Sequence, residues 1–251
     1  MNLLEQSILF LVSLVANTFS AFSGGGAGLI QFPVLIFLGL TFGVALATHK
    51  VASVALGIGA VLRYLRTSRL ERQFVWLMLV AGVPGVVLGG SVILLVPDRW
   101  AEIALGILTG GLGIYSILKT QLGQNYEPAN RSVRGYWLGG LMLFLLGFVN
   151  GSLTSGSGLF VTIWLVVWFG MDYQRAVAYT LTMVGLFWNG SGAITLGILG
   201  DIRWDWLPAL LLGSLIGGYL GSHLALKHGN RWIKRAFEIV TLLISIKLIW
   251  G

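Results

Sequence analysis

Two segments rich in glycine, hydroxyl and amide residues interrupt long apolar stretches, and their residue types suit the binding of an anion. They read NTFSAFSGGGAG at 17–28 and NGSLTSGSG at 150–158. Glycine allows an irregular backbone that turns several N–H groups toward one point, and a helix that begins after such a break carries a partial positive charge at its first turn. The candidate substrate-binding residues are Ser23, Gly24, Gly25, Gly26, Gln31, Asn150, Ser152, Thr154, Ser155, Gly156 and Ser157.

Ionisable and amide residues within apolar stretches form the second group, because such residues in a membrane are functional candidates by default. His49 and Lys50 interrupt the stretch TFGVALATHKVASVALGIGA, which contains no acidic residue. Arg175 and Asn189 occupy the equivalent stretch later in the chain. We assign these four residues to gating or coupling. Alternatively, Lys50 extends to the membrane surface and His49 bonds a backbone carbonyl, and Arg175 anchors a helix end beside Asp172.

Sequence signatures of enzymes are absent. The chain has no Cys, no pair of His at i and i+4, no G-x-S-x-G motif and no Lys that would complete a phosphate-binding loop after its glycines. We therefore expect no catalytic residues, no metal site and no cofactor, and we do not expect a pump driven by ATP.

The composition identifies the elements that must position these residues. Of the 251 residues, 56% are hydrophobic and 10% are charged, whereas soluble domains carry about 25% charged residues. Mean hydropathy is +0.87. We expect an all-α, polytopic membrane protein, which excludes a soluble enzyme. The net charge of +7 is spread over short loops, as the positive-inside rule predicts, so we expect a lipid bilayer and no nucleic acid as partner.

The two halves of the chain are related in sequence. Residues 26–29 match 156–159 at an offset of 130, and Arg99-Trp100 match Arg231-Trp232 at an offset of 132. Because the offset drifts by so little over a whole half, we predict a duplication. Both glycine-rich breaks then fall at equivalent positions, which favours a binding site between them over the alternative that the glycines only allow close helix packing.

The distribution of basic residues predicts how the halves are oriented. The loop at 63–72 has four Arg and its counterpart at 201–205 has one, whereas 97–102 has one basic residue and its counterpart at 227–235 has four Lys or Arg. Because basic loops face the cytoplasm, equivalent loops lie on opposite faces and the halves are inverted repeats. The predicted units are a first repeat at 1–118, a cytoplasmic linker at 119–134 and a second repeat at 135–251.

The lengths of the apolar stretches predict a hairpin at each break. Residues 135–149 and 159–170 would span roughly 22 and 18 Å at 1.5 Å per residue, less than the hydrocarbon core of roughly 30 Å. We predict that each repeat has a helical hairpin with a glycine-rich tip and three transmembrane helices, about eight to ten membrane segments in all. Five full crossings in each repeat remain the alternative.

The same residues resemble a known family. The stretch SGGGAGLIQFP at 23–33, its repeat at 151–159 and the two related membrane halves are similar to the TauE/SafE sulfite exporter family, also called TSUP. Two positions depart from the family pattern, because Ser157 stands within the second glycine run and Ile163 stands where the proline matching Pro33 would be. The resemblance implies movement of small sulfur-containing or carboxylate anions across the bacterial inner membrane.

Together these observations predict a multi-pass secondary transporter of the bacterial inner membrane. Its substrate would be a small anion such as sulfite or an organosulfonate, bound between the two breaks near the midplane, and export is the expected direction. A passive anion channel and uptake of another sulfur or carboxylate anion remain alternatives. An intramembrane enzyme or assembly factor is a third, for which the sequence offers no catalytic group. A homodimer is left open.

Overall fold

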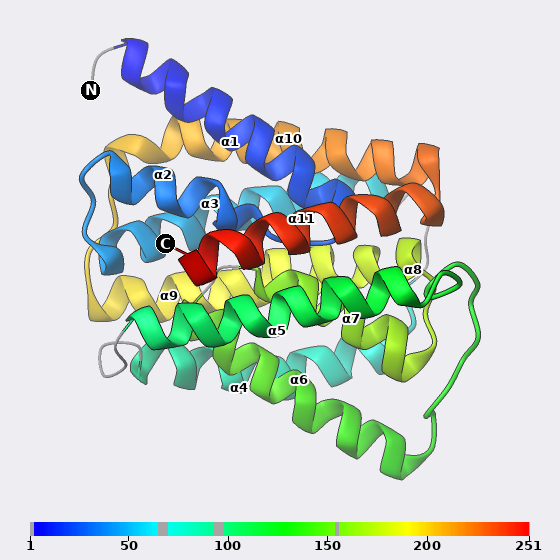
Figure 1. The fold of residues 1–251 in the computed structure, drawn as a ribbon. Helices are drawn as coiled ribbons and strands as arrows, with labels where there is room; N and C mark the ends of the chain where they lie inside the picture. Colours follow the sequence, from blue (N-terminus) through cyan, green and yellow to red (C-terminus); the bar gives the residue numbers. More distant parts are fainter. Residues whose placement is uncertain (1–2, 65–69, 93–97, 154–155, 251) are drawn as a thin grey trace.

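The computed structural model describes residues 3–64, 70–92, 98–153 and 156–250, and every regular element within these ranges is helical (Figure 1). The all-α prediction is therefore confirmed. The first half contains α1 (Leu3–Ser23), the 3-10 turn η1 (Ala27–Leu29), α2 (Gln31–Phe37), α3 (Phe42–Tyr64), α4 (Arg72–Val92) and α5 (Asp98–Leu118). The second half contains α6 (Val133–Leu153), α7 (Ser157–Phe169), α8 (Tyr173–Tyr179), the π-helical segment η3 (Thr180–Trp188), α9 (Asn189–Leu199), the 3-10 turn η4 (Trp204–Trp206), α10 (Leu207–His228) and α11 (Asn230–Trp250).

Within the described residues, six helices are long and apolar enough to cross a membrane by length and composition. They are Leu3–Ser23, Phe42–Tyr64, Arg72–Val92, Val133–Ser152, Tyr173–Leu199 and Trp204–His228, to which the shorter apolar α7 is added. α5 and α11, each of 21 residues, pack against one another beside this group. The helices lie side by side along a common direction (Figure 1), as expected of a multi-pass membrane protein.

The order of helices repeats along the chain. α1 begins at Leu3 and α6 at Val133, 130 residues later, while α5 begins at Asp98 and α11 at Asn230, 132 residues later. Each half thus has a long helix, a break, a short helix and then three long helical stretches. The first of these three stretches is the continuous α3 in the first half and the combination of α8, η3 and α9 in the second. These bounds agree with the offsets read from the sequence.

The two halves are interleaved. α1 packs along α10 at one edge of the bundle, and α6 packs along α4 at the opposite edge (Figure 1). Glycines allow both contacts, because a Cβ on Gly217 would lie 2.7 Å from the carbonyl oxygen of Leu14, and one on Gly89 would lie 2.0 Å from that of Phe148. Small residues of this kind let membrane helices approach until their backbones touch. Each half therefore depends on the other for its packing.

The helix before the second break is longer than predicted. We expected an arm at 135–149, too short to span the hydrocarbon core, but α6 extends over the 21 residues Val133–Leu153, about 31 Å at 1.5 Å per residue. Gly151 remains helical because it packs against α4, where an added Cβ would lie 2.1 Å from the carbonyl oxygen of Val86. Only the second arm, the 13-residue α7, is short.

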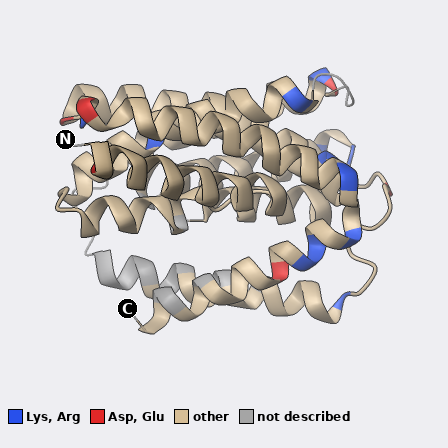
Figure 2. Cartoon of the chain, turned by 90° about the horizontal axis from the view of Figure 1, so that it is seen from above, with Lys and Arg blue, Asp and Glu red and all other residues tan. Residues whose placement is uncertain are grey.

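Charge distinguishes the two ends of the bundle. Most Lys and Arg gather at one end (Figure 2), which we call the basic end. α10 runs from Leu207 to His228, and Arg63 donates to His223 near its last turns (3.2 Å). Asp205 lies just before the first turn of α10, and its backbone oxygen accepts a hydrogen bond from the side chain of Gln6 (3.1 Å). Arg63 and the loop at 201–205 therefore lie at opposite ends of α10.

Candidate functional site

The two glycine-rich breaks meet inside the bundle. Gly25 has φ +138°, and a Cβ there would lie 2.6 Å from the backbone carbon of Gly158. The neighbouring Gly24 offers its carbonyl oxygen to the hydroxyl of Thr162 on α7 (2.6 Å). Only glycine combines such a positive φ with so close an approach of two backbones. The breaks, 130 residues apart in sequence, thus form one structural unit.

A cavity of about 40 Å³ lies where the breaks face α3 and the π-helical segment, and we call it the central cavity. A cavity needs about 10–15 Å³ to hold one water molecule, so this one is large enough for roughly three. Its polar lining consists of Ser20, His49, Ser53, Asn150, Ser157, Thr180 and Asn189. The rest of the lining is Gly25, Gly26, Ala27, Gly28, Leu56, Gly158, Leu181, Val184 and Gly185.

The central cavity lies near the middle of the bundle. Ser53 stands eleven residues after the first residue of α3, Phe42, and eleven before its last, Tyr64. Gly57, one turn further along α3, packs on Gly185 so closely that an added Cβ would lie 2.6 Å from the Gly185 carbonyl carbon. At 1.5 Å per residue, Ser53 is roughly 16 Å from either end of its helix. A ligand in this cavity would be far from both surfaces.

Lys50 is the charged residue closest to the central cavity, and it is completely buried. Its ammonium donates to the backbone oxygen of Asn150 (2.8 Å), to the Oδ1 of the same residue (3.2 Å) and to the Oδ1 of Asn189 (3.4 Å). None of the described Asp or Glu residues forms an ion pair with it. The alternative that Lys50 reaches the membrane surface is wrong, and its charge is held among neutral oxygens.

Lys50 also fixes the orientation of the two amides. The Oδ1 of Asn150 faces Lys50, so its Nδ2 is turned to the hydroxyl of Ser157 (2.8 Å) at the first turn of α7. The Oδ1 of Asn189 accepts from Lys50 and from the Nδ2 of Asn150 (3.4 Å). The NH₂ group of Asn189 is therefore the end of that amide left for a ligand, because amide oxygens accept and amide nitrogens donate.

His49 lines the central cavity from α3, together with Lys50's partners Asn150 and Asn189. Its Nδ1 lies 2.6 Å from the Oε1 of Gln31, and its Nε2 lies 3.2 Å from the hydroxyl of Ser53. The side chain is 2% exposed. His49 therefore bonds side chains, not the backbone carbonyl that we considered from the sequence. Gln31 reaches the cavity only through His49.

The remaining predicted residues lie at different distances from the central cavity. Ser23 bonds within its own break, to the carbonyl oxygens of Phe19 (2.9 Å) and Gly25 (3.1 Å). Gly156 caps the start of α7 with φ +74°, next to Ser157. Ser152 donates to the carbonyl oxygen of Phe148 on its own helix (2.9 Å) and does not line the cavity. Thr154 and Ser155 lie outside the described residues.

Three features of the cavity were not predicted. The segment Thr180–Trp188 is a π-helix, a conformation that occurs mostly as short insertions at functional sites, and it supplies Thr180 and Gly185 to the lining. Ser20 and Ser53 were also missed, although both are buried hydroxyls on membrane helices. The hydroxyls could have been found by asking which polar residues lie one helical turn from His49 and Asn17. The sequence has no comparable signal for the π-helix.

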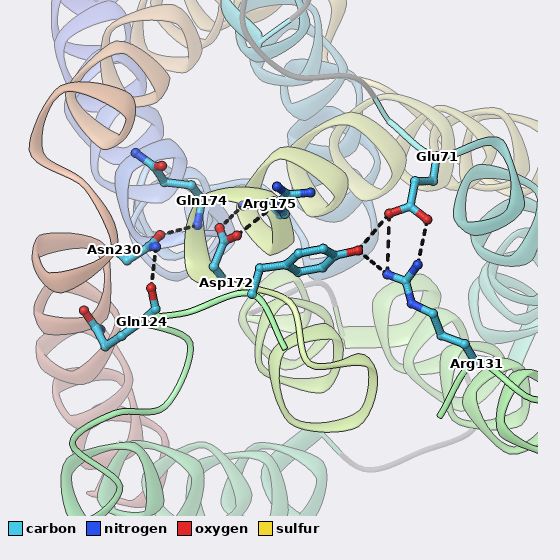
Figure 3. A network of polar contacts seen from close by, with 8 residues as sticks. Glu71, Gln124, Arg131, Asp172, Gln174, Arg175 and Asn230 are labelled. Carbon is cyan, nitrogen blue, oxygen red and sulfur yellow. Dashed lines mark hydrogen bonds and ion pairs between the residues drawn. The ribbon is translucent and has the colours of Figure 1, made fainter. Parts of the chain in front are cut away.

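Arg175 does not line the central cavity and belongs to the network of Figure 3. The neighbouring Gln174 donates to the carbonyl oxygens of Ala225 and Leu226 near the last turn of α10, which places Arg175 at the basic end. It pairs with Asp172 (2.9 Å), and its guanidinium lies over the ring of Tyr126 at 4.0 Å from the centroid. This contact at the start of α8 is the helix anchor that was the alternative to a gating role.

Glu71 and residues of the segment 119–134 form a second part of the network in Figure 3. Glu71 accepts from Arg131 (2.9 Å) and from the hydroxyl of Tyr126 (3.0 Å). Burial, and then the hydrogen bond to the Glu71 carboxylate, raise the pKa of the Tyr126 phenol. The hydroxyl of Tyr179 lies 2.5 Å from the backbone nitrogen of Glu71, which donates to it. Within the described residues, no three His, Asp or Glu side chains gather in a way that could hold a metal ion.

Comparison with known proteins connects this geometry to a family. The family model described as "Sulfite exporter TauE/SafE" matches residues 9–248. A probable membrane transporter protein of Haemophilus influenzae is 27% identical, with 97% of this chain and 94% of that protein covered. The probable membrane transporter protein YfcA of Escherichia coli K12 is 26% identical over 97% of this chain and 89% of its own length. YunE of Bacillus subtilis, also named a probable membrane transporter protein, is 23% identical over 97% of each chain.

No solved structure matches this chain. The family match covers both glycine-rich breaks, both halves and every residue that lines the central cavity. The chain therefore belongs to the sulfite exporter TauE/SafE family and is a membrane transporter of that type.

Proposed function

We propose that this protein exports a small anion, sulfite or an organosulfonate, across the bacterial inner membrane as a secondary transporter, with the central cavity as its binding site. The observation that carries the proposal is the buried charge of Lys50, which has only neutral oxygen partners beside a cavity formed by the two breaks. The family description supports sulfite as the first substrate to test.

The charge of Lys50 favours an anion over a neutral or cationic ligand. A buried ammonium without a counter-ion is unfavourable, and the three oxygens around Lys50 carry only partial charges. Two opposite unit charges 4 Å apart attract by about 4 kcal/mol at an effective dielectric constant of about 20. An anion in the cavity would supply the missing negative charge.

Neutral donors would complete the binding of the anion. The hydroxyls of Ser157 and Thr180 and the amide of Asn189 line the cavity. α7 begins at Ser157, so the partial positive charge of its first turn is directed at the same space. Many weak donors with one nearby cation bind a small oxyanion and still release it, which a transporter requires.

The cavity volume favours the smaller of the two proposed substrates. About 40 Å³ is enough for roughly three water molecules, since one water needs about 10–15 Å³. Sulfite is the smaller anion, whereas an organosulfonate carries an additional carbon chain for which the cavity would have to widen. We therefore place sulfite ahead of organosulfonates.

We further propose that the two halves are inverted repeats that alternate around the cavity. Arg63 and the loop at 201–205 lie at opposite ends of α10. The contact of α1 with α10 also has its equivalent in the contact of α6 with α4. Both observations support inversion. In transporters built in this way, the substrate binds near the midplane between discontinuous helices.

The test is sulfite flux in proteoliposomes. Wild-type flux should saturate with concentration and show counterflow, which distinguishes a transporter from a passive channel. Lys50→Met should lower flux at least about tenfold, because hydrogen bonds to charged groups contribute about 1.5–3 kcal/mol, and Lys50→Arg should retain part of it. The control is Lys227→Met, which makes the same change at an exposed position at the end of α10. Equal flux in Lys50→Met and Lys227→Met would contradict the proposed role of the buried charge.

A further inference from the structure

A chain of buried polar side chains leads from the central cavity toward the contact of α1 with α10. Ser53 lines the cavity and bonds His49 (3.2 Å), and His49 bonds Gln31 (2.6 Å). The Nε2 of Gln31 donates to the hydroxyl of Ser13 (2.9 Å), which also donates to the carbonyl oxygen of Leu210 on α10 (2.7 Å). All four side chains before Leu210 are at most 2% exposed.

The direction of each hydrogen bond in this chain follows from its far end. A carbonyl oxygen accepts only, so the hydroxyl hydrogen of Ser13 belongs to Leu210. Ser13 must then accept from Gln31, which places the Nε2 of Gln31 on that side and its Oε1 toward His49. The Oε1 also only accepts, so the Nδ1 of His49 carries a hydrogen. In a neutral His49, the Nε2 is therefore the atom with a free lone pair, and it faces Ser53.

We propose that the Nε2 of His49 is the acceptor of a proton that moves together with the anion, so that this protein couples transport to protons; this rests on the proposed function of the central cavity. The proton enters at the cavity and is passed through the hydroxyl of Ser53 to the Nε2. The hydrogen bond between them then reverses, with His49 as donor and Ser53 as acceptor. The hydroxyl hydrogen of Ser53 becomes free to face the anion in the cavity.

The groups around His49 explain why the anion and the proton should bind together. α1 contributes Ser13 and Asn17, α2 contributes Gln31 and the ring of Phe32, and α10 contributes Ser214. On α6 and α9, the cavity presents the amides of Asn150 and Asn189. None of these is ionisable, and the next residue on α3, Lys50, is the charged group beside His49. A second positive charge here is unfavourable until an anion occupies the cavity, so each ligand raises the affinity for the other.

The second half of the chain has no counterpart of the adjacent His49 and Lys50. At the offset of 131 that relates α3 to the stretch formed by α8, η3 and α9, His49 corresponds to Thr180 and Lys50 to Leu181. One proton acceptor therefore serves the whole site. A monovalent anion would move with one proton, without net charge, and its transport would not respond to membrane potential.

The experiment measures gradient-driven accumulation of radiolabelled sulfite in proteoliposomes, with the flux into protein-free liposomes subtracted. An imposed pH gradient should drive accumulation at least about fivefold more in wild type than in His49→Gln. Glutamine places an amide at this position, which forms hydrogen bonds but cannot accept a proton. Because His49 lines the central cavity, His49→Gln should also lower sulfite counterflow, so the accumulation of each variant is divided by its own counterflow rate before comparison. The acid–base equilibrium of sulfite is identical in all samples, so the difference between variants reports on the protein. His223→Gln, at an exposed position on α10, is the matched control and should behave as wild type.

Ser53→Ala is the second variant, and it tests the proposal even if His49→Gln does not fold. It leaves His49 in place but removes the hydroxyl between the Nε2 and the cavity, so gradient-driven accumulation should fall by more than counterflow does. Accumulation equal to wild type in either folded variant would overturn the proton coupling. Counterflow in all variants supports the proposed function independently, whereas wild-type protein without any sulfite flux would overturn both proposals.

Discussion

At the centre of the bundle, Lys50 is fully buried and donates only to neutral oxygens, whereas at the basic end Arg131 and Arg175 each pair with a carboxylate. The Arg131 pair is partly exposed, with 29% of the Arg131 side chain and 40% of the Glu71 side chain accessible. Lys234 on α11 is buried like Lys50, but it pairs with Glu238. Among these cations, Lys50 is therefore the one that is buried without a carboxylate partner. This arrangement is unfavourable unless a ligand completes it, so it marks the site that requires a ligand.

The largest effect on this contrast is expected when the two glycine-rich segments are forced apart. Gly25→Ala places a Cβ 2.6 Å from the backbone of Gly158 at φ +138°, a conformation that L side chains rarely adopt. Because neither backbone can move without opening the central cavity, we expect sulfite affinity to fall by more than about a hundredfold, which is about 2.7 kcal/mol or more. Thermal-shift titration with sulfite measures the affinity.

The control for this variant is Gly111→Ala on α5, where an added Cβ meets nothing within 4 Å. Alanine is more favourable than glycine in a helix by up to about 1 kcal/mol, so this protein should be as stable as wild type or slightly more stable. Wild-type sulfite affinity in Gly25→Ala would mean that the breaks serve packing alone.

A second variant sharpens the contrast by disturbing the neutral oxygens and leaving the charge in place. Asn189→Ala removes one acceptor of Lys50 and one amide of the central cavity. Loss of a hydrogen bond to a charged group should weaken sulfite binding by about 1.5–3 kcal/mol, roughly tenfold to a hundredfold. Calorimetry measures the change, with Ser191→Ala as control because its hydroxyl bonds only the carbonyl oxygen of Trp188 on its own helix (2.9 Å). If Asn189→Ala and Ser191→Ala bind sulfite equally, the amide has no part in the site.

The sequence predicted the two breaks and singled out Lys50 because these features are local. Glycine runs, hydroxyl clusters and a Lys inside an apolar stretch can each be recognised within about ten residues. It did not predict that Lys50 would meet Asn150, which is 100 residues away, nor that Ser13 and Gln31 would order the hydrogens around His49. Those contacts depend on how separate helices pack together, which no local pattern specifies.

The length of α6 and the π-helix show the same limit from the other side. Gly151 looked like the end of a helix, because glycine destabilises helix interiors by about 1 kcal/mol. Contact with α4 compensates for this, and the helix continues to Leu153. Thr180–Trp188 has an ordinary apolar composition, so its π-helical conformation follows from packing against Gly57 and the breaks, not from its own residues.

The smallest effect is expected at the basic end, and it tests whether compensated charge is structural. Glu71→Gln removes the ion pair with Arg131, and partly exposed pairs contribute only about 0–1 kcal/mol, so the melting temperature should fall by no more than about 2–4 °C. Sulfite flux should be unchanged. The pKa of the Tyr126 phenol, which burial and the Glu71 carboxylate raise, should fall toward its ordinary value once the negative charge is gone. Ultraviolet titration of the phenolate measures this shift, with Tyr126→Phe identifying the signal. A large loss of flux in Glu71→Gln would instead place the network of Figure 3 in the transport cycle.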